Sequence, residues 1–169
     1  MLHEGINIEL TYRLRAMNRI VDRIVPNSHD QAFDEVVEVM LEAATQRKFS
    51  DAAAILEDAL QANTSWLRGY LLLATIYQST EQFIRAITTL RQGLNICIKG
   101  SRLFSLAKWA AMMDCLNGPH VHERVRRSAE RFKRYEQIFR HRMAMVQTHT
   151  GDFDDALENW VALVGERSV

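Results

Sequence analysis

The chain has 169 residues, of which 21 are Lys or Arg, 21 are Asp or Glu, seven are Gly and two are Pro. This length suits one domain, and an apolar fraction of 47% can supply a full-sized core. The scarcity of Gly and Pro argues against all-β folds, which need frequent turns. The balanced charge lacks the cationic excess that would indicate a nucleic-acid or membrane-surface partner.

The cysteines and the N-terminus indicate the compartment. Cys97 and Cys115 both fall inside apolar helical patterns, which favours buried, reduced thiols. The first nine residues lack the apolar centre of a signal peptide, and no window reaches the roughly 18 apolar residues of a membrane span. We therefore expect a cytoplasmic protein without a membrane span.

The first periodic segment has a single apolar face at helical spacing and ends at Pro26. We define residues 1–28 as an N-terminal amphipathic helix, followed by a helical domain over residues 29–169. The apolar face could cap the first helices of that domain, or it could meet a second copy and form a homodimer. It consists of Leu10, Leu14, Met17, Val21 and Ile24.

The remaining chain alternates apolar helical segments with short polar breaks, which predicts nine helices in all and no strand. Two helices come before residue 63, one on each side of the polar residues 46–50. The later helices are expected at 66–79, 83–98, 101–116, from 121, at 135–150 and at 152–165.

A regular repeat underlies this alternation. Ala52, Ala86 and Ala156 stand near the start of the second helix of a pair, and His122 occupies the same position in the third pair. In chain order these four position numbers differ by 34, 36 and 34. A helix-turn-helix period of roughly this length is that of the tetratricopeptide repeat.

Other positions of the repeat also resemble the tetratricopeptide (TPR) family. The second repeat is the best match, and the segment 151–157 resembles the turn between the two helices of the family's repeat. The third repeat departs from the pattern, because His122 and Arg126 stand where the family has Ala and an apolar residue. The second repeat supplies Tyr70, Leu73, Ala74, Tyr77, Phe83, Ala86, Leu90 and Gly93.

The resemblance implies an all-α, right-handed superhelix of about four repeats preceded by the N-terminal helix. It also implies a groove lined by the first helix of each repeat. The Lys and Asn residues with which some TPR domains bind a C-terminal carboxylate are absent, since Val37, Leu41 and Leu72 occupy those positions. Such a groove suits an apolar partner segment, or the N-terminal helix folded back into it. The expected groove residues are Val37, Leu41, Leu71, Leu72, Thr75 and Gln78.

Charge is unevenly distributed along the chain. Residues 30–42 contain five acids and no base, and residues 152–158 add a second acidic patch. The segment 122–142 has eight bases and three acids. This basic segment could attract an acidic peptide or phosphates, or it could be a solvated face with Glu–Arg pairs at i, i+4. Its candidate surface residues are Arg124, Arg126, Arg127, Arg131, Lys133 and Arg134.

No motif in the sequence indicates catalysis. His120 and His122 point to different faces of a helix start, and the other histidines have no metal-ligand or nucleophile pattern beside them. We therefore expect no catalytic residue, no metal and no cofactor.

These observations predict a non-enzymatic protein–protein interaction module, an adaptor or assembly factor, that binds an apolar or acidic partner segment in the groove. One alternative is a chaperone similar to the TPR class of bacterial secretion chaperones, which hold apolar segments of export substrates. A second alternative is an RNA-binding or regulatory helical-repeat protein that uses the basic segment. We do not expect a nucleic-acid partner, because the aromatic residues of that segment fall at helix-packing spacing.

Overall fold

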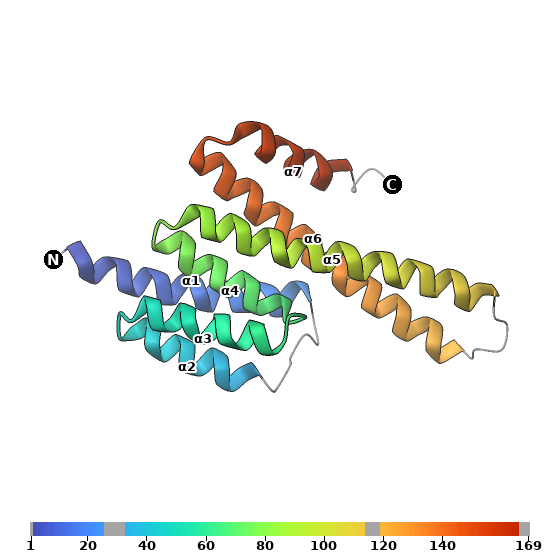
Figure 1. Ribbon diagram of the computed structural model, residues 1–169, viewed down its shortest axis with the longest axis horizontal. Helices are drawn as coiled ribbons and strands as arrows, with labels where there is room; N and C mark the ends of the chain where they lie inside the picture. The colour runs from blue at the N-terminus through green and yellow to red at the C-terminus, as the bar shows by residue number, and fades with distance from the viewer. Residues whose placement is uncertain (1, 26–32, 114–118, 166–169) are drawn as a thin grey trace.

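The computed structural model describes residues 2–25, 33–113 and 119–165, with side chains over 9–25, 33–103 and 126–165. These residues form seven α-helices and no strand, so the predicted all-α class is confirmed (Figure 1). No helix in the described ranges has the length and hydropathy needed to cross a membrane. The helices are α1 (Leu2–Ile24), α2 (Asp34–Thr45), α3 (Phe49–Ala62), α4 (Leu67–Ser79), α5 (Phe83–Met113), α6 (Pro119–Thr150) and α7 (Phe153–Gly165).

The helices from α2 to α7 stack in chain order, each packing against the next (Figure 1). α1 departs from this order, because it lies against α2 and α4 rather than beside α2 alone. The core runs through the stack, and Leu56, Leu72 and Phe139 are fully buried in it. α1 therefore covers the face that α2 and α4 share.

Three turns between helices have the same backbone conformation. Arg47, Glu81 and Gly151 follow α2, α4 and α6 with φ angles of 64°, 59° and 87°. In each turn the next residue donates its N–H to the carbonyl five residues earlier, at distances of 3.0, 2.8 and 2.9 Å. A left-handed residue with this hydrogen bond is a common end for a helix. The turn therefore recurs in the pairs α2–α3, α4–α5 and α6–α7.

The alanines that define the sequence repeat occupy equivalent places in these pairs. Ala52, Ala86 and Ala156 lie in α3, α5 and α7, and their exposed fractions are 0%, 0% and 3%. Each donates its N–H to the carbonyl four residues earlier. A small buried residue allows the second helix of a pair to approach its neighbour closely. The repeat found in the sequence is thus also a repeat of backbone geometry.

The prediction of nine helices is wrong for the middle of the chain. The segment 83–98 and the described part of 101–116, up to Met113, belong to one helix, α5, and the helix expected from 121 continues through 135–150 as α6. Neither helix contains an interior Pro, and an interior Gly costs only about 1 kcal/mol relative to Ala. The expected third repeat is therefore not a separate unit, because its two helices are the outer halves of a long α5–α6 hairpin (Figure 1).

Aromatic packing sets the register of this hairpin. A Cβ atom at Gly93 would lie 2.3 Å from the Phe139 ring, and one at Gly100 would lie 2.7 Å from the Phe132 ring. The two glycines are seven residues apart on α5, and the two phenylalanines are seven residues apart on α6. One antiparallel register satisfies both contacts, since seven residues span two helical turns. Gly100, which lies between the segments expected as separate helices at 83–98 and 101–116, is instead a point of close approach within one helix.

Polar contacts fix the C-terminal end of α1. The carboxylate of Asp22 pairs with Arg68 of α4, whose exposed fraction is 4%. Arg134 of α6 donates a hydrogen bond of 3.0 Å to the carbonyl of Ile24, the last residue of α1. A cation at this position also interacts favourably with the helix dipole. α1 is thus held by both α4 and α6.

The shared turn predicts opposite effects of two substitutions. Glu81→Gly should raise the free energy of unfolding by about 0.5–1 kcal/mol, because relief of the left-handed strain exceeds the extra entropy of an unfolded glycine. Gly151→Ala should lower it by about 1 kcal/mol for the converse reason. Urea unfolding followed by circular dichroism measures both, and a destabilising Glu81→Gly would contradict the turn geometry.

The hairpin register predicts that Gly100→Leu destabilises the protein by about 1–3 kcal/mol, because the new side chain meets Phe132. Phe132→Ala in the same chain should recover part of this loss. Gly165→Leu is the control, since a Cβ there meets nothing within 4 Å. Equal thermal midpoints for Gly100→Leu and Gly165→Leu would disprove the contact.

The ion pair of α1 predicts that Asp22→Asn lowers the free energy of unfolding by about 1–3 kcal/mol, because it leaves the buried Arg68 charge without its carboxylate. Glu9→Gln is the matched control, since Glu9 and its partner Arg13 are both more than half exposed. Its effect should stay within about 0.5 kcal/mol. Chemical unfolding measures both variants. Equal losses in the free energy of unfolding would show that the Asp22–Arg68 pair stabilises the fold no more than an exposed pair does.

Candidate functional site

The predicted groove residues lie beneath α1. Val37, Leu71, Leu72 and Thr75 are at most 7% exposed, and Leu41 and Gln78 are partly buried. α1 packs against α2 and α4, the two helices that carry these residues. The structure therefore places the N-terminal helix over the apolar part of this face, whereas Thr75 and Gln78 also line a hollow beside α1.

The predicted face of α1 is the side that packs into the core. Leu10, Leu14, Met17 and Val21 are at most 5% exposed, so this face is not available to a second copy. Ile24 is different, because 39% of it is exposed and Val25 is buried in its stead. Of the two alternatives for this face, the burial of its first four residues within one chain fits the cap of the first helices rather than a contact with a second copy.

The opposite side of α1 has an exposed apolar ridge. Tyr12 and Ile20 are 69% and 46% exposed, and Ala16 lies between them at the same spacing of four residues. These three residues, which we call the α1 ridge, line two hollows, one on each side of the helix. A ligand on this face would contact the ridge and could enter both hollows.

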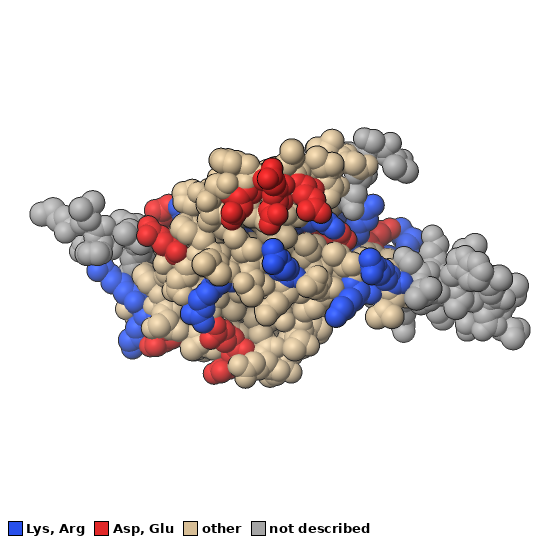
Figure 2. Space-filling model, turned by 45° about the horizontal axis from the view of Figure 1, so that its top comes forward, with Lys and Arg blue, Asp and Glu red and all other residues tan. Residues whose placement is uncertain are grey.

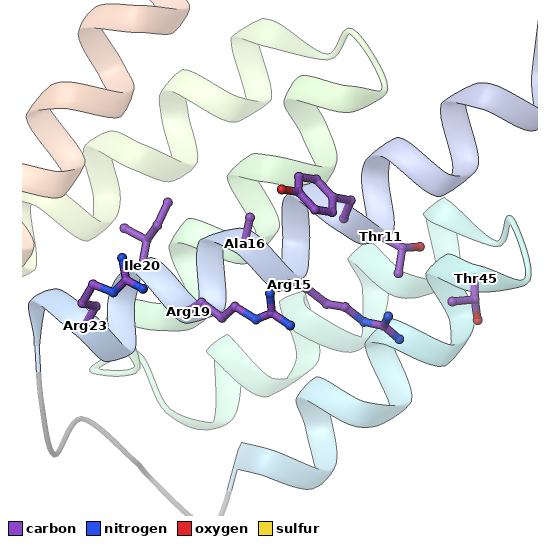
Figure 3. A pocket seen from close by; sticks show the side chains of 8 residues that line it. Thr11, Arg15, Ala16, Arg19, Ile20, Arg23 and Thr45 are labelled. Atoms are coloured by element: carbon purple, nitrogen blue, oxygen red, sulfur yellow. The ribbon is translucent and has the colours of Figure 1, made fainter.

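The first hollow, which we call the α2-side hollow, has a volume of about 640 Å³ and reaches Thr45 at the end of α2. Arg15, Arg19 and Arg23 line it at spacings of four residues, and all three are exposed. Arg15 and Arg19 extend from the same side of α1, and Ile20 points away from them (Figure 3). Among the described residues no carboxylate pairs with any of these three arginines.

The second hollow, the α6-side hollow, has a volume of about 680 Å³ and lies between α1, α4 and α6. Its walls combine apolar side chains with a few charged ones, and the rings of Phe83 and His149 pack together at 5.1 Å. It is lined by Glu9, Leu10, Tyr12, Arg13, Ala16, Met17, Ile20, Thr75, Gln78, Ser79, Glu81, Phe83, Arg142, Met145, Val146 and His149.

Arg142 is the cation at the base of the α6-side hollow. It donates hydrogen bonds to Gln78 Oε1 at 2.6 Å and to Thr75 Oγ1 at 3.3 Å, both neutral acceptors. Burial, and to a smaller extent the positive charge of Arg13, lower the pKa of Arg142. Within the described chain no carboxylate pairs with Arg142, whereas Arg13 pairs with Glu9. A partly buried cation without a counter-ion favours the binding of an anion beside it.

The surroundings of the α1 ridge are therefore basic and apolar together. Five arginines line the two hollows, at positions 13, 15, 19, 23 and 142, against the two acids Glu9 and Glu81. Guanidinium groups bind carboxylates through paired hydrogen bonds, and exposed Tyr and Ile side chains add apolar contact area. This surface can bind a segment that carries both acidic and apolar side chains.

The predicted basic surface on α6 is used partly for internal contacts. Arg126 pairs with Glu130 at 2.7 Å, and Arg134 donates a hydrogen bond to the carbonyl of Ile24 at the end of α1. Arg127, Arg131 and Lys133 are exposed. The side chain of Arg124 lies outside the described residues. At least two cations of the predicted surface, Arg126 and Arg134, therefore make contacts within the fold.

For the histidines and cysteines we expected no metal site and buried, reduced thiols. In the part of the chain that the structure describes, no group of His, Cys, Asp and Glu side chains could hold a metal ion. Cys97 is buried, and burial raises the pKa of its thiol. Cys115 lies outside the described residues, as do the side chains of His120 and His122.

Sequence analysis missed the α1 ridge and the arginines around it. The spacing of Arg15, Arg19 and Arg23 was a readable signal, because residues four apart share a face of a helix. Arg142 gave no such signal. Its role depends on α4, which is distant from α6 in the sequence and supplies both of its acceptors.

Comparisons with known proteins found no relative of this chain. No family model matches the chain, and no match was found to a curated protein or to a solved structure.

Proposed function

We propose that this chain is a non-enzymatic protein-binding module that takes an acidic, amphipathic segment of another protein across the α1 ridge. The observation that carries the proposal is the combination of an exposed apolar ridge with five surrounding arginines, of which only Arg13 pairs with a carboxylate in the described residues. A partner's carboxylates would supply the missing counter-ions, and its apolar side chains would cover Tyr12 and Ile20.

We also propose that the fold is a TPR-like superhelix. The recurrent left-handed turn at Arg47, Glu81 and Gly151 supports this assignment, together with the buried alanine five residues after each turn residue. The turn residues of the first two pairs are separated by the same interval as Ala52 and Ala86, as a repeat requires. An adaptor or assembly role fits such a scaffold, because stacked helix pairs create an extended binding surface.

The secretion-chaperone alternative would place an apolar export segment where α1 now lies, so it requires α1 to leave α2 and α4. The RNA alternative rests on the basic segment of α6, where Arg126 and Arg134 already have protein partners. By contrast, no carboxylate of the described residues pairs with Arg15, Arg19 or Arg23, the exposed arginines beside the α1 ridge. We therefore favour binding of an acidic protein segment.

The proposal predicts what the protein selects from a displayed library of random peptides. Peptides selected by the unmodified chain should combine Asp or Glu with apolar residues and should have negative net charge. Their binding, measured by fluorescence anisotropy, should weaken about tenfold or more for the double variant Arg15→Glu with Arg19→Glu, because attraction becomes repulsion. Both positions are exposed, so folding should be retained.

Arg91→Glu with Arg102→Glu is the matched control, since both residues are exposed on α5 and line neither hollow. This control should bind the selected peptides as the unmodified chain does. Selected peptides without acidic residues, or peptides that bind the Arg15 and Arg19 variant undiminished, would disprove the proposal. A uridine oligonucleotide that competes with the peptides would favour the RNA alternative instead.

A further inference from the structure

α7 has an apolar face that no described part of the chain covers. Phe153, Leu157, Val161 and Val164 are 61–66% exposed, and their spacings of four, four and three residues place them on one side of the helix. The opposite side packs against α6 through Ala156 and Asn159, which are buried. A continuous apolar stripe of this kind at the end of a helical stack is typical of an interaction surface.

The position of α7 is fixed by a polar network, so this face is presented in one orientation. Asn159 donates a hydrogen bond of 3.0 Å to Gln147 Oε1, and both side chains are buried. Gln147 in turn donates to Asp155 at 3.3 Å. A satisfied buried network favours a single arrangement of the two helices.

The charge around the α7 stripe is negative. Asp152, Asp154, Asp155 and Glu158 are exposed, and α7 contains no Lys or Arg. Figure 2 shows acidic side chains gathered at the end of the molecule where α7 lies. Two α7 faces brought together would repel each other, which disfavours a symmetric contact through α7.

The α1 ridge has the complementary chemistry. It is apolar at Tyr12, Ala16 and Ile20, and Arg15 and Arg19 stand beside it without carboxylate partners among the described residues. Its residues follow the same spacing of four as Phe153, Leu157 and Val161 of α7. Rows of residues at this spacing on two helices can interlock as ridges and grooves, and the small Ala16 leaves room between its larger neighbours.

We propose that the acidic apolar face of α7 docks on the α1 ridge of a second copy of this chain. Within one molecule α4, α5 and α6 stack between α7 and α1, so the contact forms between copies (Figure 1). The contact joins two different surfaces, and each copy therefore keeps one free α7 face and one free ridge, from which larger assemblies can grow. The inference rests on the proposed function, since it names a second copy as one bearer of the acidic segment.

Sedimentation velocity of the full chain tests this contact. The average mass should rise above 19.5 kDa with concentration, and the rise should shrink in about 1 M salt, where the screening length is about 3 Å. The ridge variant, Arg15→Glu with Arg19→Glu, and the α7 variant, Leu157→Lys with Val161→Lys, should each need at least about a tenfold higher concentration to associate. Ile84→Lys is the control, because Ile84 is 84% exposed on α5 and should leave association unchanged.

Mixing the two variants gives the sharpest result. The ridge variant keeps an intact α7 and the α7 variant keeps an intact ridge, so the mixture should form a 1:1 dimer that grows no further. Association of the ridge variant alone at the concentrations where the unmodified chain associates, or a mixture that stays monomeric, would overturn the proposal. An unmodified chain that stays monomeric throughout would also overturn it. Acidic peptides that still bind the ridge in that case would leave the proposed function intact, whereas loss of both would overturn both.

Discussion

Burial of the apolar face of α1 against α2 and α4 is the constraint on which the remaining architecture depends. Leu14 and Val21 are fully buried there, together with Leu72 of α4. Without α1, the shared face of α2 and α4 would expose a broad apolar surface to water, at roughly 25 cal/mol for each Å² uncovered. The contacts of Asp22 with Arg68 and of Arg134 with the carbonyl of Ile24 then fix the C-terminal end of the helix. The same packing turns the arginines of α1 outward, where they create the candidate site.

The long hairpin has a different role in the fold. Gly93 and Gly100 of α5 lie against Phe139 and Phe132 of α6. These two close contacts are seven residues apart on each helix, and they hold α5 and α6 together. Because α6 also contributes Arg134 and Arg142, the register of the hairpin determines where these two cations meet α1 and α4. The geometry of the α6-side hollow thus depends on packing that lies outside it.

Opposite charges surround the exposed side of α1 and the helix α7 at one end of the stack. The acidic side chains of α7 surround an apolar stripe, and the arginines of α1 surround an apolar ridge. A net charge of zero hides this separation, because it sums all 21 bases and 21 acids of the chain whatever their position. Apolar contact supplies most of the free energy of such an interface, and charge decides which surfaces can meet. The proposed binding of acidic segments and the proposed self-association follow from this one arrangement.

Local sequence patterns were enough to predict the all-α class, the place of α1 along the chain and the turns that separate α2 from α3, α4 from α5 and α6 from α7. Helical periodicity and the positions of Gly, Pro and polar breaks are local properties, and they are sufficient for these features. The continuity of α5 through Gly100 could not be read locally, because the contact with Phe132 decides whether that glycine breaks a helix. Tertiary packing alone placed α1 over the predicted groove residues and brought Arg142 to Gln78. Both depend on helices that are distant in the chain, and an apolar stripe has the same sequence pattern whether a partner or the chain's own helix covers it.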